Sequence, residues 1–205
     1  MAITINGNTN TISGLAVGGL PDGIVDTDML AAGAATKAKR TYSAGEIIQT
    51  QSFIYTAITE SYSSRGFHAT PVTTQITPVA TSSKILVMAT LTAGNEAVGE
   101  GAAFKVMRSV GGASYADTVA VGADAGNSST QGAVGGLYDQ NLATHTDCRS
   151  IQFVDTPSTT SAIDYKIYVY LWDGDKPCTI NRPHTASSGE HITGSSSIIL
   201  MEVAG

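Results

Sequence analysis

Residues 162 to 172 read AIDYKIYVYLW, and this alternating stretch constrains the fold more than any other part of the chain. Successive side chains of a β-strand point to opposite faces, so a period of two predicts a strand with one buried face. The predicted buried face carries Ile163, Tyr165, Ile167, Val169 and Leu171, and the opposite face Asp164, Lys166, Tyr168, Tyr170 and Trp172.

Comparable β-forming stretches recur along most of the chain. The longer ones cover residues 46–61, 84–94, 102–109, 149–156 and 196–203, and the shorter ones 72–77, 115–121, 132–138 and 177–183. In the stretch 102–109 we expect Phe104 and Val106 to face Lys105, Met107 and Arg108 across the strand. Gly, Ser, Asn and Pro turns separate the stretches, and no amphipathic helix of useful length stands out. The sequence therefore predicts an all-β fold, a jelly-roll-like β-sandwich over residues 42–205.

Charge and hydropathy exclude two classes of partner. The chain of 205 residues has a net charge of −6 and no run of Lys or Arg, so we expect no nucleic acid binding. The chain has no apolar stretch of about 18 residues, the length that a membrane-spanning helix needs, so we expect no membrane insertion. The N-terminus lacks the basic and apolar regions of a secretory signal. The chain is expected to stay in the cytosol unless it leaves as part of a larger assembly.

The segment before the predicted sandwich has a weak ten-residue repeat. Gly23-Ile24-Val25 recurs as Gly33-Ala34-Ala35, and Asp26 could cap a short helix over 27–32. A helix that short is marginal alone, but copies packed around an axis would bury apolar side chains. The residues that would be buried are Ile24, Val25, Met29 and Leu30. Residues 1–41 are thus predicted to be an N-terminal adaptor and stalk of a trimer; a flexible linker with chance periodicity is the alternative.

Tests for catalytic and metal chemistry give no site. None of the four histidines has a metal-binding spacing, and in a strand His145 would point away from Cys148. Carboxylates in the stretches 121–127 and 173–177 could hold Ca²⁺ loosely, but turn residues explain them equally well. Cys148 and Cys178 lack metal spacing, and a reducing compartment disfavours a disulfide between them. We expect no cofactor, no metal and no enzymatic activity.

Aromatic residues give the candidate binding site. Tyr168, Tyr170 and Trp172 would share one strand face, where such rings stack on sugars or fill protein interfaces. The alternative is that this face is a second core face of the sandwich. Long polar loops such as 182–191 lie where recognition is usually built, and His184 lies in that loop. The candidate receptor-binding residues are therefore Tyr168, Tyr170, Trp172 and His184.

Two parts of the sequence resemble tail-fibre proteins of marine and cyanobacterial phages. The opening MAITINGNTNTISGLAVGGLPDGIVDTDMLA resembles their stalks, and FVDTPSTTSAIDYKI with the closing LMEVAG resembles their β-rich C-terminal domains. The resemblance implies a homotrimeric virion protein, assembled in the host cytoplasm, whose jelly-roll head contacts a host surface glycan or protein. It departs from the stalk pattern at GAATKAKRTY, which lacks the Thr-Leu-Ala core.

The departure leaves several functions open. The chain could be a fibre tip that docks through residues 1–40 onto another virion protein, which is the leading hypothesis. It could equally be a trimeric capsid decoration or head-fibre protein. A third reading is a monomeric carbohydrate-binding module or a depolymerase fragment, although no pair of carboxylates suitable for glycoside hydrolysis stands out.

Overall fold

The computed structural model describes residues 4–6, 8, 11–13, 40–95, 102–119, 134–137, 146–171, 177–183 and 193–205. The chain divides into two compact units, Met1–Thr41 and Tyr42–Gly205. Within the described ranges all regular structure is β-strand and no helix occurs. The predicted all-β class is confirmed.

The first unit contains one small hairpin. Strands β1 (Thr4–Asn6) and β2 (Thr11–Ser13) pair antiparallel, with Asn6 opposite Thr11. Asn6 is followed by Gly7, a dipeptide that favours tight turns. The predicted helix over 27–32 and the residues assigned to the stalk, Ile24, Val25, Met29 and Leu30, lie outside the described residues.

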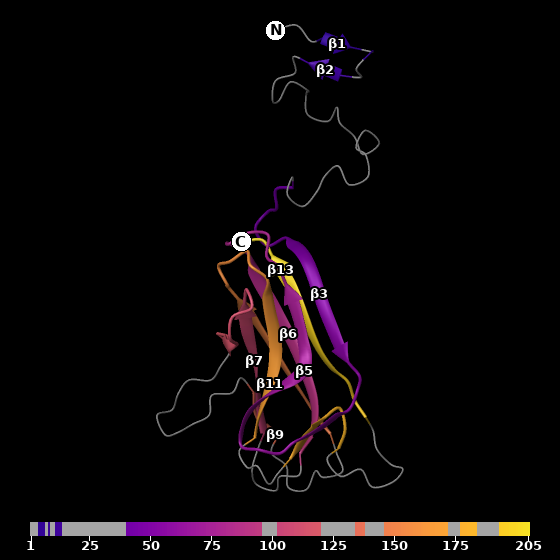
Figure 1. Ribbon diagram of the computed structural model, residues 1–205, viewed down its shortest axis with the longest axis vertical. Helices are drawn as coiled ribbons and strands as arrows, with labels where there is room; N and C mark the ends of the chain where they lie inside the picture. Colours follow the sequence, from indigo (N-terminus) through magenta and orange to yellow (C-terminus); the bar gives the residue numbers. More distant parts are fainter. Residues whose placement is uncertain are drawn as a thin grey trace. The chain divides into compact units, whose positions relative to one another are not determined.

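The second unit contains a six-stranded antiparallel sheet built around one long central strand, β6 (Figure 1). Its strands are β3 (Ile47–Tyr55), β4 (Thr59–Tyr62), β6 (Lys84–Asn95), β10 (Asp147–Asp155), β12 (Cys178–Ile180) and β13 (Ser196–Val203). Strand β10 follows one edge of β6, while β13 and β12 share the other edge, one after the other. Strand β3 pairs with β13, and β4 pairs with β12.

The second sheet has five strands and is also antiparallel. Its strands are β5 (Gly66–Ile76), β7 (Ala102–Val110), β8 (Ala116–Asp117), β9 (Val134–Leu137) and β11 (Ile163–Leu171). Strand β11 lies between β5 and β7, and the short strands β8 and β9 both pair with β7. Two antiparallel sheets of this kind are consistent with a β-sandwich.

Alternate residues of the long strands form the core between the sheets. On β11 the five residues predicted to be buried are all buried, and on β6 the residues Ile85, Val87, Ala89, Leu91 and Ala93 are buried in the same alternating way. Strands β12 and β13 add Cys178, Ile180, Ile198 and Leu200. Each fully buried large aliphatic side chain contributes about 1.5–3 kcal/mol, so this alternation accounts for the pairing of the two sheets.

Two sequence-based expectations are wrong in detail. The stretch 46–61 is divided into β3 and β4 rather than forming one strand. Strand β5 begins at Gly66, well before the predicted stretch 72–77, and it runs through Pro71. The pairing of β5 with β11 is irregular around Pro71, because Lys166 pairs with Thr73 whereas Tyr168 pairs with Ala69. A proline is tolerated in a strand at such an irregularity, where its missing N–H is not needed for pairing.

Arg108 is the third correction. The sequence analysis grouped it with Lys105 and Met107 opposite Phe104, but its guanidinium bonds to the carboxylate of Asp155, which is buried. Arg108 therefore shares the inward side of β7 with Phe104, as strict alternation requires. The ion pair between Arg108 and Asp155 joins β7 of one sheet to β10 of the other.

Candidate functional site

Tyr168 and Tyr170 lie on the outer face of the five-stranded sheet, opposite the core. They alternate along β11 with the buried Ile167, Val169 and Leu171, and each tyrosine is half-buried. Both side chains are partly exposed and neither belongs to the buried core, so in the described part of the chain this face is not a second core face. Trp172 and His184 lie outside the described residues.

The neighbouring strands decide what surrounds each tyrosine. Tyr168 is opposite Ala69 on β5 and Lys105 on β7. Tyr170 is opposite Phe67 on β5 and Ala103 on β7. Each tyrosine thus has a short alanine side chain on one side, which leaves space beside its ring.

Tyr170 forms an aromatic pair with Phe67. The two ring centroids are 4.9 Å apart and the ring planes are inclined by 56°. The Arg65 side chain donates a hydrogen bond from Nε to the Tyr170 hydroxyl at 3.5 Å. Tilted aromatic pairs of this kind favour a fixed ring orientation over free rotation.

Lys105, opposite Tyr168 on β7, contacts the Phe67 ring of this pair. Its Nζ lies 3.8 Å from the Phe67 ring centroid and 2.5 Å from Oδ1 of Asp117. Its side chain is buried, so the ammonium group needs these partners to offset its lost hydration. Lys105 therefore positions Phe67, and its charge is already paired with a carboxylate.

Tyr168 forms a second aromatic pair, with Tyr115. Their ring centroids are 5.7 Å apart and the planes are inclined by 56°. The Nζ of Lys166 lies 5.0 Å from the Tyr115 ring centroid, on the same side of the sheet. Burial, and then the neighbouring Tyr115, raise the pKa of Tyr168, so its phenol stays neutral at physiological pH and can both donate and accept.

We call the surface formed by Phe67, Tyr115, Lys166, Tyr168 and Tyr170 the aromatic face. Tyrosine rings offer an apolar surface for the C–H groups of a sugar and hydroxyls for its polar groups. Lys166 adds a cation near one of the ring pairs. The arrangement suits the binding of a polar ligand with apolar patches, such as a glycan. Phe67 and Tyr115 were missed by the sequence analysis, because Phe67 is identified by the pairing register of β5 with β11 and Tyr115 lies in the loop before β8.

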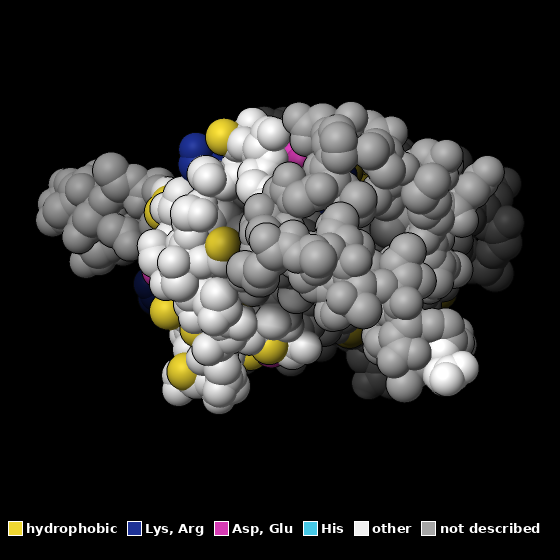
Figure 2. Space-filling view, turned by 90° about the horizontal axis from the view of Figure 1, so that it is seen from above, with side chains coloured by type: hydrophobic (Ala, Val, Ile, Leu, Met, Phe, Trp, Pro, Cys, Tyr) yellow, Lys and Arg dark blue, Asp and Glu magenta, His cyan; other side chains and the backbone are white. Residues whose placement is uncertain are grey.

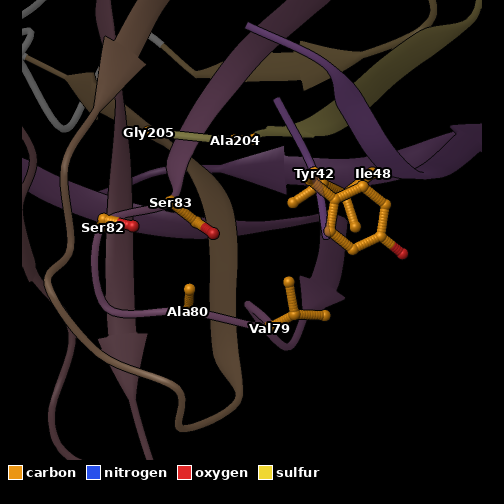
Figure 3. Close-up of a pocket in the computed structure, with 8 residues that line it drawn as sticks. All are labelled: Tyr42, Ile48, Val79, Ala80, Ser82, Ser83, Ala204 and Gly205. Carbon is orange, nitrogen blue, oxygen red and sulfur yellow. The ribbon is translucent and has the colours of Figure 1, made fainter. Parts of the chain in front are cut away.

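A cavity separate from the aromatic face lies at the end of the sandwich where β3 begins. A cavity of about 150 Å³ is lined by Tyr42, Ile48, Val79, Ala80, Ser82, Ser83, Ala204 and Gly205 (Figure 3). Its lining is mostly short or apolar, with the Ser83 hydroxyl bound 2.6 Å from Oε1 of the buried Glu202. Oε1 of Glu202 also accepts from the backbone N–H of Val79 at 2.7 Å. The carboxylate is occupied by these bonds, which makes it a structural anchor for the loop before β6.

Metal and thiol chemistry is not assembled in the described part of the chain. No group of three or more His, Cys, Asp or Glu side chains is placed there to hold a metal ion. Both cysteines are free, Cys148 exposed and Cys178 buried. Burial raises the pKa of Cys178 to about 12, which keeps its thiol protonated and unreactive. The stretch 121–127 and most of 173–177, the two possible Ca²⁺ loops, lie outside the described residues.

Comparison with known proteins adds no relative: no protein-family model and no curated protein matches the chain. Among the described residues, none belongs to a helix with the length and apolar character needed to cross a bilayer.

Proposed function

We propose that the protein is a non-enzymatic virion protein of a bacteriophage, the tip of a tail fibre that recognises a host surface receptor as a homotrimer. In this proposal residues 1–41 form the adaptor and stalk, and the second unit is a jelly-roll-like head. The resemblance of the opening and of FVDTPSTTSAIDYKI to phage tail-fibre sequences supports the virion assignment.

The aromatic face is the observation that carries receptor recognition. There are two tilted aromatic pairs, Phe67 with Tyr170 and Tyr115 with Tyr168. The two partners of the β11 tyrosines come from β5 and from the loop before β8. Strands β5 and β7 hold β11 on both sides, so the rings are presented by a rigid sheet. A preorganised aromatic surface loses little conformational entropy when it binds a glycan. The proposed receptor is therefore a bacterial surface polysaccharide.

The test measures binding of the full-length chain to an array of purified bacterial surface polysaccharides. We expect the double variant Tyr168→Ala and Tyr170→Ala to lose at least tenfold in affinity, because each lost stacking ring contributes more than about 1 kcal/mol. Thr160→Ala, an exposed position in the loop between β10 and β11, is the control and should bind as the wild type does. Equal binding by the double variant and the wild type would exclude the aromatic face as the receptor site.

The competing function is a capsid decoration or head-fibre protein, favoured by the incomplete stalk repeat at GAATKAKRTY. Labelled antibody on whole virions separates the two, because label at the tail supports the fibre tip and label spread over the shell supports the decoration protein. The stalk itself is tested by Ile24→Asp with Leu30→Asp, which should abolish the oligomer.

A further inference from the structure

We propose that the outer face of the six-stranded sheet is the surface through which the heads of neighbouring copies of this chain pack together. This inference deepens the proposed function by assigning the homotrimer a contact surface in the head, and it concerns a different face from the aromatic one.

The pairing register identifies the side chains of this outer face. Residues paired directly across an antiparallel sheet lie on the same face, so the partners of Leu86 and Met88 on β6 can be read from the ladders. One row across the sheet is Thr50, Met201, Leu86 and Val154; the next is Ser52, Ile199, Met88 and Gln152; the third is Ile54, Ser197, Thr90 and Ser150. Their alternate neighbours on β6 and β13 are the buried core residues.

These three rows contain no charged residue, and half of their side chains are large and apolar: Ile54, Leu86, Met88, Val154, Ile199 and Met201. Lys84 lies beyond the first row, opposite Val203, at the margin of the face. By contrast, the outer face of the other sheet carries Asp164, Lys166 and Asp117 in the same kind of register. Figure 2 shows one end of the molecule, seen from above Figure 1, where few Lys, Arg, Asp or Glu side chains are visible in the described surface.

The margins of the face are its most exposed apolar positions. The side chains of Ile54 on β3 and Val154 on β10 are 63% and 51% exposed. Strand β3 pairs with β13 on one edge, and in the described part of the chain no strand pairs with its other edge. Its sequence IIQTQSFIY has no charge and no proline, the residues that usually protect an edge from association. A monomer would leave this edge and face open to aggregation.

A second copy of the chain is the occupant that fits this chemistry. A charged partner would lose hydration against this face without finding an opposite charge, whereas around a three-fold axis the other two copies turn equally uncharged faces toward it. Four strands about 4.8 Å apart and three rows that span five residues at about 3.3 Å each give a flat face of roughly 300–350 Å². Side chains add accessible area to that projection, so the face would supply about half of the roughly 800 Å² per partner of a standard interface.

The first measurement is the native mass of the full-length protein by light scattering over a range of concentrations. We expect the wild type to have a multiple of the 21.1 kDa chain mass. The variant Ile54→Lys with Val154→Lys should associate at least tenfold more weakly, because a lysine buried between two such faces has no counter-charge. The matched control is Ile58→Lys with Val119→Lys, two positions 52% and 67% exposed that lie outside the three rows. It should associate as the wild type does.

Cys148 supplies a second measurement that does not depend on the stalk. Its side chain belongs to the outer face, since it pairs with Thr92 on β6 two residues beyond Thr90, and Cys178 is buried. We expect a thiol reagent to modify Cys148 more slowly as the wild-type concentration rises, and at a concentration-independent rate in the Ile54→Lys and Val154→Lys variant. Circular dichroism on the same samples checks that both variants are folded.

The outcomes separate this inference from receptor recognition. Weaker association, or release of Cys148 protection at unchanged mass, in the face variant but not in the control supports the inference. A wild type that is monomeric up to about 100 µM, or a face variant with unchanged mass and unchanged Cys148 reactivity, overturns it. Polysaccharide binding is measured on the same variants, so a failure of receptor recognition would show in that readout and leave the association result intact.

Discussion

At the scale of single residues, Asp155 connects the two sheets through a buried carboxylate. It accepts hydrogen bonds from Nη1 of Arg108 and, at 2.7 Å, from the hydroxyl of Tyr165. Burial alone would lower the pKa of Arg108, but the hydrogen bond and charge of Asp155 outweigh it and raise that pKa. Asp155 therefore holds the guanidinium of Arg108 in its charged form between the sheets.

Replacing Asp155 with Asn removes the charge and keeps the shape of the side chain. We expect the free energy of unfolding in urea to fall by about 3 kcal/mol, because the partly buried guanidinium of Arg108 loses its counter-charge. Asp164→Asn is the matched control: its carboxylate bonds Gln75 at 3.2 Å on the outer face, so the loss should be below about 1 kcal/mol. Equal losses in the two variants would contradict the role given to Asp155.

Asn181 joins four strands at the other end of the sandwich. Its Nδ2 donates to the carbonyls of Tyr55 and Ala57 at 2.8 and 2.9 Å, and its Oδ1 accepts from the Ser196 hydroxyl at 2.7 Å. Its backbone has φ of 64°, in the left-handed region that asparagine tolerates better than most residues.

Two substitutions separate these roles of Asn181. Asn181→Ala should lower the free energy of unfolding by about 3 kcal/mol, since it leaves the buried Ser196 hydroxyl and two partly buried carbonyls without their partner and strains the backbone. Asn181→Gly loses the same hydrogen bonds but accepts the positive φ, so it should be about 1 kcal/mol more stable than the alanine variant. Urea unfolding measures both, and an alanine variant as stable as the glycine variant would show that the backbone is not strained there.

At the scale of elements, the irregular pairing of β5 with β11 is held by one threonine. The Thr70 hydroxyl donates to the Ile167 carbonyl at 2.8 Å and accepts from the Val72 N–H at 3.2 Å. These bonds satisfy backbone groups beside Pro71 that regular pairing would otherwise serve. Thr70 is buried, so water cannot replace the hydroxyl.

Thr70→Val should therefore destabilise the strand pair. We expect a loss of about 1–3 kcal/mol in the free energy of unfolding, the cost of leaving two buried backbone groups unsatisfied. The change is largest in hydrogen exchange of the β5 and β11 amides, which would open more often. Thr160→Val, the same substitution at an exposed position in the loop between β10 and β11, should change stability by less than about 0.5 kcal/mol. Protection of β5 that is unaffected by Thr70→Val would refute this account.

The elements also show what a sequence can predict here. Strand β11 is predictable because its strict alternation has one buried phase, and the outward position of Tyr168 and Tyr170 follows from it. Strand β5 is not, because Gly66 and Pro71 are turn signals that only the irregular pairing with β11 accommodates. Phe67 and Tyr115 join the candidate site through the register of β5 and the loop before β8. Local sequence patterns do not specify such register when both faces contain aromatic residues.

At the scale of the whole molecule, the two outer sheet faces differ in chemistry. One presents aromatic pairs among Asp117, Asp164 and Lys166, and the other presents uncharged rows bounded by an unprotected edge. Charged residues make up only 14% of the chain, and those named here lie on the outer face of the five-stranded sheet. Our two proposals assign receptor binding to the aromatic face and contact between copies to the outer face of the six-stranded sheet.

Alkaline pH should destabilise the whole fold, because burial raises the pKa of several acidic groups, among them Cys178 and Tyr62, which lie opposite each other on β12 and β4. Burial raises the pKa of Cys178 from 9.0 to about 12. Burial, and then the neighbouring Cys178 and Tyr55, raise the pKa of Tyr62 from 10.0 to about 12. Above pH 9 the unfolded chain therefore binds fewer protons than the folded one, so the free energy of unfolding falls as pH rises from about 9 to 12. Below pH 9 both groups are protonated in both states and contribute no slope.

The variant Cys178→Ala isolates the thiol in this profile. At pH 7 we expect it to be destabilised by about 1 kcal/mol, because a small buried volume is lost. Its stability should fall less steeply than that of the wild type between about pH 9 and 10, because only the wild type has a thiol that ionises in the unfolded chain and stays protonated in the folded one. Urea unfolding at half-unit steps of pH compares the two curves. Parallel curves between pH 9 and 10 would mean that the Cys178 thiol ionises equally in both states, which is incompatible with its complete burial.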